Sequence, residues 1–255
     1  MLPRDHIQQA LTLQGEPALV AFLTAGYPRP NEFLSTLQQV AAAADAVEIG
    51  VPFSDPMADG VTIQRSSERA IEQGVSLSWI LDQVGARDFE LEAPVLLMSY
   101  LNPLLAFGFT RLAKRAADIG LSGFMVPDLP YEESSELRHE LDEHGLALVQ
   151  FVTPATPLSR LSELCTASQG FVYAITRTGI TGGESGLPPE LAEYLAAIKA
   201  VSALPVCAGF GVREADQVRS IARHADGVIV GSALVEVLER GGDPTAFLST
   251  LRGAP

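Results

Sequence analysis

Basic residues are scarce in this chain of 255 residues. Lysine and arginine together number 17, against 31 aspartates and glutamates, and the formal net charge is −14. That sign opposes binding along a nucleic-acid backbone or an anionic membrane, because both need cationic side chains to neutralise phosphates. One small anion is not excluded, since a local group of backbone N–H donors can bind it against the overall field. We therefore expect any bound phosphate to be held by backbone groups.

Long apolar runs and cysteines are scarce as well. The most apolar stretch, 93–109, is interrupted by Asn102 and two prolines, and it is shorter than a membrane-spanning helix requires. The first residues show no apolar segment followed by a small-residue cleavage site. The only cysteines are Cys165 and Cys207, which we expect to be small core residues. These features predict a cytoplasmic protein in a reducing environment.

Short apolar runs alternate with longer amphipathic runs along the whole chain. Nearly continuous apolar runs are typical of strands in a parallel sheet that is covered on both faces. Eight strands are predicted, at 18–24, 46–50, 94–99, 122–126, 146–151, 171–176, 205–208 and 227–230. Helices are predicted between them at 31–44, 110–119, 132–143, 158–167, 189–200 and 214–223.

No linker rich in proline, glycine or serine divides these repeats. Eight strand–helix units without a break predict an α/β protein with one domain over residues 1–255, a single (β/α)8 or TIM barrel. An extra N-terminal helix at 4–13 is expected to close the bottom of the barrel. A further helix fits near 62–73, in the wide gap between the second and third strands.

Glu48 is the first candidate for chemistry, because active sites of such barrels lie at the carboxyl ends of the strands. Its neighbours Val47 and Ile49 are apolar, and side chains alternate along a strand, so Glu48 points into the barrel near its mouth if the apolar pair faces the helices. A carboxyl there loses hydration and titrates high, as a group that both gives and takes a proton requires. The alternative interpretation is a structural ion pair.

The segment that follows, 51–60, crowds two carboxylates, two prolines and a glycine into ten positions. Such a stiff loop suggests a positioned group. Asp59 is the second candidate, although an aspartate before Gly60 and a helical stretch also fits an N-cap. For Asp55 alone, a turn or cap is at least as good an interpretation as a functional one.

Glycines near the last two strands predict a phosphate site. Gly209 and Gly211 follow the seventh strand, and Gly231 and Ser232 follow the eighth. Barrels often hold a phosphate in these two loops, where glycine allows close approach and a helix start supplies N–H donors. The irregular loop 176–186, rich in glycine and hydroxyls, is predicted to be a lid beside this corner.

Two aromatic residues are further candidates for the site, whereas the histidines are not. Phe22 and Tyr173, on the first and sixth strands, are candidate walls for a flat aromatic substrate. The four histidines lie on or beside predicted helices, with no cysteine or carboxylate at metal-ligand spacing, so no metal site is expected.

Residues 48–64 read EIGVPFSDPMADGVTIQ, and this run resembles the signature of the tryptophan synthase α-subunit family. The resemblance covers essentially the whole chain. Further similar runs are FLTAGYP at 22–28, MSYLNP at 98–103, VPDLP at 126–130, TGITG at 178–182 and GFG at 209–211. Met57 and Val61 depart from the family pattern, which usually has leucine and proline there, and Val61 could loosen the loop.

The resemblance implies a lyase of tryptophan biosynthesis, which cleaves indole-3-glycerol phosphate by a retro-aldol reaction to indole and glyceraldehyde 3-phosphate. Glu48 would be the general acid–base, and Asp59 would accept the indole N–H and stabilise the protonated ring. The remaining residues that match substrate-binding positions are Phe22, Tyr173, Thr181, Gly182, Gly211, Gly231 and Ser232.

The resemblance also implies a partner. The family forms an α2β2 heterotetramer with a β subunit, which receives indole through a tunnel and carries the pyridoxal phosphate, so no cofactor is expected in this chain. Pro52, Asp55 and Asn102 match positions that face the β subunit.

Three alternatives stay open at this level. A stand-alone indole-3-glycerol phosphate lyase would share every catalytic residue and differ only in acting without a β subunit. A sugar-phosphate isomerase typically uses two aspartate bases or a lysine, and no lysine lies at a strand end here. A barrel that only activates a β subunit would not need an intact Glu48 and Asp59.

Overall fold

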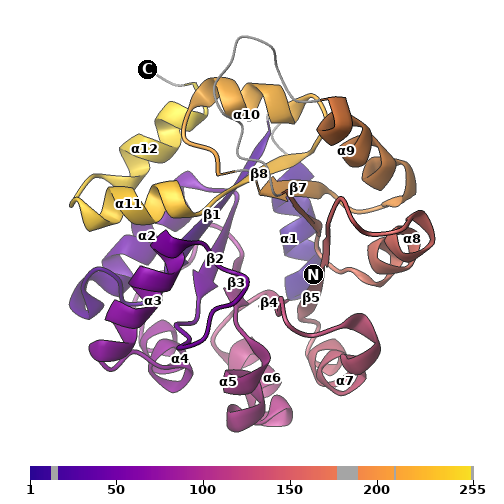
Figure 1. The fold of residues 1–255 in the computed structure, drawn as a ribbon. Coiled ribbons are helices and arrows are strands. Elements are labelled where there is room, and N and C mark those ends of the chain that lie inside the picture. Colours follow the sequence, from indigo (N-terminus) through magenta and orange to yellow (C-terminus); the bar gives the residue numbers. More distant parts are fainter. Residues whose placement is uncertain (13–16, 177–188, 210, 254–255) are drawn as a thin grey trace.

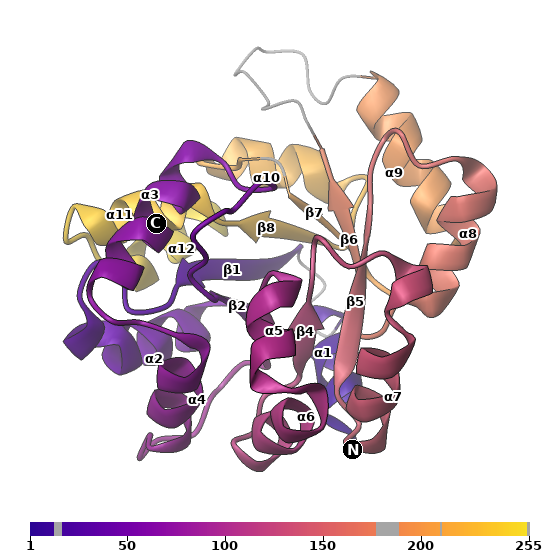
Figure 2. The same cartoon turned by 60° about the horizontal axis from the view of Figure 1, so that its bottom comes forward.

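The computed structural model describes residues 1–12, 17–176, 189–209 and 211–253. Eight parallel strands pair in chain order and close into a barrel, with helices around it (Figures 1 and 2). The strands are β1 (Ala18–Thr24), β2 (Ala46–Gly50), β3 (Val95–Met98), β4 (Gly123–Met125), β5 (Ala147–Val152), β6 (Val172–Ile175), β7 (Val206–Gly209) and β8 (Gly227–Val230). The predicted (β/α)8 barrel is confirmed, and every strand end lies within one residue of its predicted place.

The helices form the outer layer of the barrel. They are α1 (Pro3–Thr12), α2 (Phe33–Ala43), α3 (Val61–Glu72), α4 (Leu77–Gly85), α5 (Leu101–Phe107), α6 (Phe109–Asp118), α7 (Ser135–Glu143), α8 (Leu158–Ala167), α9 (Pro189–Val201), α10 (Ala215–Ala222), α11 (Ser232–Glu239) and α12 (Pro244–Leu251), with 3-10 turns η1 (Pro30–Glu32) and η2 (Tyr131–Glu133). In the described part of the chain, none is long and apolar enough to cross a membrane.

Four of these helices, α4, α5, α11 and α12, were not predicted. The buried side chains of α11 include Ala233, Leu234, Val235 and Leu238, and its polar residues Ser232, Glu236 and Glu239 recur at helical spacing, but this pattern spans only eight residues. For α12 a signal was available, because the Asp243 side chain caps the helix at the backbone N–H of Thr245 and Ala246.

Each strand places alternate side chains inside and outside the barrel. Val47 and Ile49 belong to the large cluster between strands and helices, whereas Ala46 belongs to the separate cluster that fills the barrel. Because side chains alternate along β2, Glu48 faces the interior together with Ala46, as predicted.

Helix α1 closes the lower end of the barrel. Ile7 is fully buried and Leu11 nearly so, and both pack into the interior cluster. The helix is fixed from outside by an ion pair of 2.5 Å between Arg4 and Asp142 and by a hydrogen bond from the Arg4 backbone N–H to the Gly145 carbonyl. The predicted closure is confirmed, and the opposite end of the barrel remains for the site.

Candidate active site

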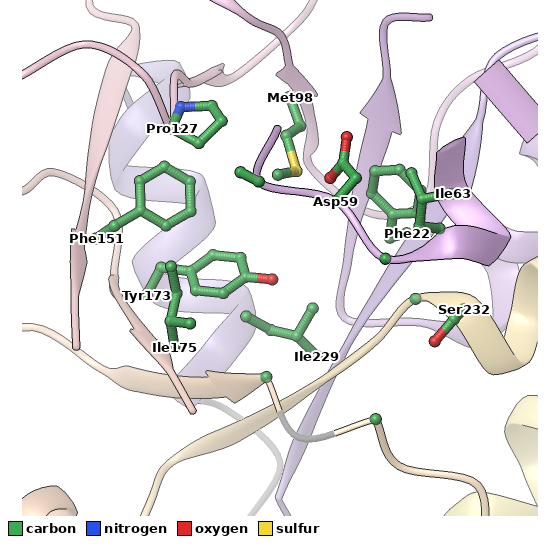
Figure 3. Close-up of a pocket in the computed structure, with 15 residues that line it drawn as sticks. Phe22, Asp59, Ile63, Met98, Pro127, Phe151, Tyr173, Ile175, Ile229 and Ser232 are labelled. Carbon is green, nitrogen blue, oxygen red and sulfur yellow. The ribbon is translucent and has the colours of Figure 1, made fainter. Parts of the chain in front are cut away.

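A pocket of about 210 Å³ opens at the carboxyl ends of the strands (Figure 3). Its walls come from β1, β3, β5, β6, β7 and β8, from the loops after β2, β4 and β7, and from the first turns of α3 and α11. The predicted site residues that line it are Phe22, Asp59, Tyr173, Gly209, Gly211, Gly231 and Ser232. The structure therefore brings together the candidate carboxylate, the two aromatic walls and the candidate phosphate corner.

Glu48 lies within the barrel and does not itself line this pocket. Its side chain is fully buried, and within the described residues neither carboxyl oxygen has a hydrogen-bond partner. Burial raises the pKa of Glu48 to about 8, because the charged form has lost its hydration. No salt bridge in the described ranges involves Glu48, so the ion-pair interpretation is not supported. At neutral pH the group is mainly a neutral acid with its proton available.

Tyr173 lines the pocket and lies close enough to the buried Glu48 for the two groups to interact electrostatically. Figure 3 shows its hydroxyl directed into the pocket from β6. Burial, followed by the negative charges of Glu48 and Asp59, raises the pKa of Tyr173 well above its ordinary value. The phenol therefore stays protonated and can donate a hydrogen bond to a bound molecule.

Asp59 lies on the loop between β2 and α3 and is partly buried. The hydroxyl of Tyr100 donates a hydrogen bond to its Oδ2 at 3.2 Å, and Gln64 Nε2 donates one to its backbone carbonyl at 2.8 Å. Burial raises the pKa of Asp59, and the hydrogen bond from Tyr100 opposes that shift. Gly60, not Asp59, is the N-cap of α3, and it has no side-chain cap. The N-cap interpretation of Asp59 is therefore wrong.

Tyr100 is a site residue that the sequence analysis missed. Its hydroxyl also accepts a hydrogen bond of 2.9 Å from the backbone N–H of Ala58, and its ring stacks on Phe53 with centroids 4.9 Å apart. The available signal was an aromatic side chain with a hydroxyl two residues after the end of β3, at the catalytic edge of the barrel.

The aromatic walls are set by close packing. The ring of Tyr173 packs against Phe151 with centroids 4.8 Å apart. The ring of Phe22 occupies the space over Gly50, where an added Cβ would lie 2.4 Å from its Cζ. Any larger residue at the end of β2 would displace Phe22, so the glycine there fixes one wall of the pocket.

The candidate phosphate corner is assembled at the start of α11. Ser232 is the first residue of the helix and Gly231 is its N-cap, while Gly211 adopts a φ of +64° in the loop after β7. A helix start presents free N–H groups and a favourable dipole to an anion. Thr181 and Gly182, with most of the predicted lid, lie outside the described residues.

Of the candidate partner-facing residues, Asp55 and Asn102 are exposed and Pro52 is buried. Met57 and Val61 are exposed by 86% and 79%, so the loop that carries Asp59 presents apolar side chains to solvent. Val61, one of the departures from the family pattern, begins α3.

Metal-binding side chains do not cluster in the ranges described. Searched over those residues, histidine, cysteine, aspartate and glutamate form no group of three or more that could hold a metal ion. The acidic groups at the site are thus individual carboxyls, each with its own surroundings.

The fold and the site define a (β/α)8-barrel enzyme with a buried carboxyl below one pocket, and with a second carboxylate and a helix start on the walls of that pocket. Comparisons with known proteins agree with this class. Residues 8–249 match the family model described as tryptophan synthase alpha chain. The chain belongs to the tryptophan synthase alpha chain family.

Individual relatives cover nearly the whole chain. The tryptophan synthase alpha chain of Nitratidesulfovibrio vulgaris is 43% identical over 235 residues, which are 92% of this chain and 91% of the relative. That of Chromobacterium violaceum is 44% identical over 92% of this chain and 90% of the relative.

Solved structures show the same barrel. Tryptophan synthase subunit alpha from Legionella pneumophila superposes with a TM-score of 0.87 at 33% identity, over 99% of this chain and 98% of that one. A chain of Mycobacterium tuberculosis tryptophan synthase superposes with a TM-score of 0.85 at 35% identity, over 98% and 95%.

Proposed function

We propose that this chain is the α subunit of a tryptophan synthase and cleaves indole-3-glycerol phosphate to indole and glyceraldehyde 3-phosphate. The observation that carries the proposal is Glu48, a fully buried carboxyl without a partner among the described residues and with a pKa near 8. Such a group is costly to the fold, and it is suited to give and then accept a proton near neutral pH.

The proposed reaction begins at the indole ring. Glu48 gives its proton to C3 of indole, and the ring nitrogen takes up the positive charge. Asp59, on the pocket wall, accepts the N–H and stabilises that charge through proximity. Since Glu48 lies below the pocket, its side chain must turn toward the substrate, and no hydrogen bond within the described residues opposes that turn.

Cleavage follows from the same carboxyl. The Glu48 carboxylate removes the proton from the hydroxyl on the carbon attached to C3, the carbon–carbon bond breaks, and its electron pair returns to the ring. Indole and an aldehyde result, and Glu48 is again protonated. The protonated ring itself accepts the electrons, so the proposed steps call on no cofactor.

The phosphate would be held by backbone donors around Gly211, Gly231 and Ser232, which line the same pocket as Asp59. Substrate binding at both ends places the bond to be broken in the middle of the pocket. The lid residues Thr181 and Gly182 are proposed to cover this arrangement.

The experiment that tests the activity is a discontinuous assay for indole released by the isolated chain. Indole release that is lost in Glu48→Gln supports the proposal. A folded parent chain that releases no indole, alone or with a β subunit, contradicts it.

A β subunit is the proposed partner, in an α2β2 assembly in which pyridoxal phosphate belongs to the β subunit. The relatives reported above are named as alpha chains, which favours this role over that of a stand-alone lyase. Asp55 and Asn102 are exposed at the rim where such a partner would dock.

Docking at this rim is expected to raise kcat, because a partner that prefers the closed loop shifts the chain toward it. Titration of the parent chain with β subunit tests this, and Asp55→Ala should reduce the activation while leaving the slow rate of the isolated chain unchanged. Full activation of Asp55→Ala would show that this loop does not carry the coupling.

A further inference from the structure

Glu236, on α11, holds together three separate segments of the chain. Its carboxylate accepts two hydrogen bonds from the guanidinium of Arg213, at 2.7 Å and 2.9 Å, and one from Thr62 Oγ1 at 3.3 Å. The Glu236 side chain is only 18% exposed, although it carries a charge. One carboxylate thus joins the start of α3, the loop after β7 and the helix α11.

Each of these segments also carries a residue of the candidate site. Thr62 lies three residues after Asp59, and Arg213 lies two residues after Gly211. Glu236 itself lies one helical turn beyond Ser232. The bridge therefore connects the loop at the ring end of the pocket with both segments of the phosphate corner.

The bridge is ionised under ordinary conditions. Hydrogen bonds from Arg213, more than any other contact, lower the pKa of Glu236 to about 2. A bidentate pair between a guanidinium and a carboxylate has a defined geometry in addition to its strength. The three segments are consequently held in one orientation rather than merely attracted to one another.

A second bridge between the same two helices serves as an internal comparison. Arg65, one turn further along α3, pairs with Glu239 of α11 at 2.6 Å. Figure 2 shows α3 and α11 side by side, and their residues are in contact. The Arg65–Glu239 bridge joins the same pair of helices and also contacts Tyr27, but among the described residues it makes no bond to the loop after β7 or to the first turn of α3.

We propose that Glu236 is a positioning residue for the cleavage reaction, through which binding of the substrate phosphate orients the loop that carries Asp59. This inference rests on the proposed function. The phosphate, when bound at Gly211 and Ser232, fixes the loop after β7 and the start of α11. Glu236 passes that constraint to Thr62, and the short connection back to Asp59 sets the direction of its carboxylate.

The energetic reason is that binding energy from a remote part of a substrate can be used to orient groups at the reacting centre. A substrate without the phosphate then loses turnover as well as affinity. If Glu236 carries the connection, its removal should make the phosphorylated substrate behave more like the truncated one.

The test compares indole-3-glycerol phosphate with indole-3-glycerol, which lacks the phosphate, in the parent and in Glu236→Gln. Glu236→Gln should lower kcat for the phosphorylated substrate about tenfold, as misplacement of a catalytic group does. Its kcat for indole-3-glycerol should remain within about twofold of the parent value, because without a bound phosphate there is no constraint for Glu236 to transmit. Glu239→Gln is the matched control and should change neither value.

Two further variants break the bridge at its other ends. Thr62→Val removes the hydroxyl while keeping the shape of the side chain, and Arg213→Gln removes the bidentate pair. Both should reproduce the selective loss, and neither should add to the effect of Glu236→Gln, since all three act through one connection.

Equal losses with both substrates would overturn the inference, because a purely structural role lowers both. Parent-like kinetics of Glu236→Gln, or a loss matched by Glu239→Gln, would overturn it as well. In each of these cases the parent still cleaves its substrate, so the proposed function stands. A parent that releases no indole from either substrate instead overturns the proposed function, and this inference with it.

Discussion

The hydroxyl of Tyr100 bridges Asp59 to the backbone of the preceding residue, donating to Oδ2 of Asp59 at 3.2 Å and accepting the N–H of Ala58 at 2.9 Å. A side chain that follows β3 thereby sets the direction of a carboxylate that follows β2. Stacking on Phe53 holds the Tyr100 ring in place from the other side. The orientation of Asp59 is thus a property of two elements and not of its loop alone.

Tyr100→Phe should lower kcat about 10- to 100-fold, because a hydrogen bond to a charged group is worth about 1.5–3 kcal/mol. The stacked ring is retained, so the fold and the KM should change little. Steady-state kinetics together with a thermal melt check this. Tyr131→Phe is the control, since Tyr131 lies outside the pocket, against Arg138. A Tyr100→Phe chain as active as the parent would remove Tyr100 from the site.

Glu48→Gln should fold normally and lose cleavage, with a loss at or beyond the upper end of the roughly 10²–10⁴-fold range of general acid–base catalysis. In the parent, kcat should fall as the pH rises through about 8, because the acid form of Glu48 must start the reaction. A pH profile of kcat measures this. Residual activity of the variant within about tenfold of the parent would contradict the assignment.

The stability of the two chains should also diverge with pH. In the folded parent Glu48 keeps its proton up to about pH 8, whereas the unfolded chain releases it near the ordinary value of 4.5. Since the folded state binds the extra proton, the free energy of unfolding falls between these two pH values as the pH rises. Glu48→Gln has no carboxyl to titrate at this position. Its free energy of unfolding should therefore rise relative to that of the parent by up to about 1.4 kcal/mol per pH unit. Denaturant unfolding at pH 5 and pH 8 measures the difference, and a constant difference would show that Glu48 is not buried in solution.

Asp59→Asn should lower kcat much more than it raises KM. The charge that Asp59 stabilises is complete only once the ring is protonated, so the interaction belongs mainly to the transition state. Both constants have to be measured on the same preparation. A pure rise in KM would mean that Asp59 serves only in binding.

Ser232→Leu should weaken binding of inorganic phosphate and glyceraldehyde 3-phosphate much more than binding of an indole analogue without a phosphate. The bulk of leucine obstructs the start of α11, where the backbone donors lie. Ser232→Ala keeps the backbone N–H and should lose far less affinity. Calorimetric titration distinguishes the two variants, and equal losses for phosphate and indole ligands would indicate a distorted pocket.

The barrel was predictable because nearly every strand is a short apolar run, and the direction of Glu48 followed from its two apolar neighbours. The helices that were not predicted show the limit of inference from local sequence patterns. Helix α11 has only eight residues, fewer than the window over which a helical period is normally recognised, and it supplies both Ser232 and Glu236. Its existence depends on packing against β1 and α3, which are remote in the sequence.

The residues of the candidate site were predictable from the sequence, but most of the contacts between them were not. The carboxyls and glycines were found because they lie at strand ends in a barrel. The hydrogen bonds from Tyr100 to Asp59 and from Thr62 to Glu236 join residues 41 and 174 positions apart, and no local pattern marks such pairs. The depth of Glu48 below the pocket was also not apparent, because alternation gives the direction of a side chain and not how much covers it.

Helix α1 occupies one end of the barrel. With Ile7 and Leu11 packed into this lower end, the pocket of the described residues opens at the other end, at the rim formed by the loops after the strands. The exposed residue Asp55 lies on the loop between β2 and α3, and the exposed residue Asn102 lies in the first turn of α5, which follows β3 at that rim. A protein docked there would stand across the exit path of indole, so an uncharged product that would otherwise diffuse away would meet the partner before it met bulk water.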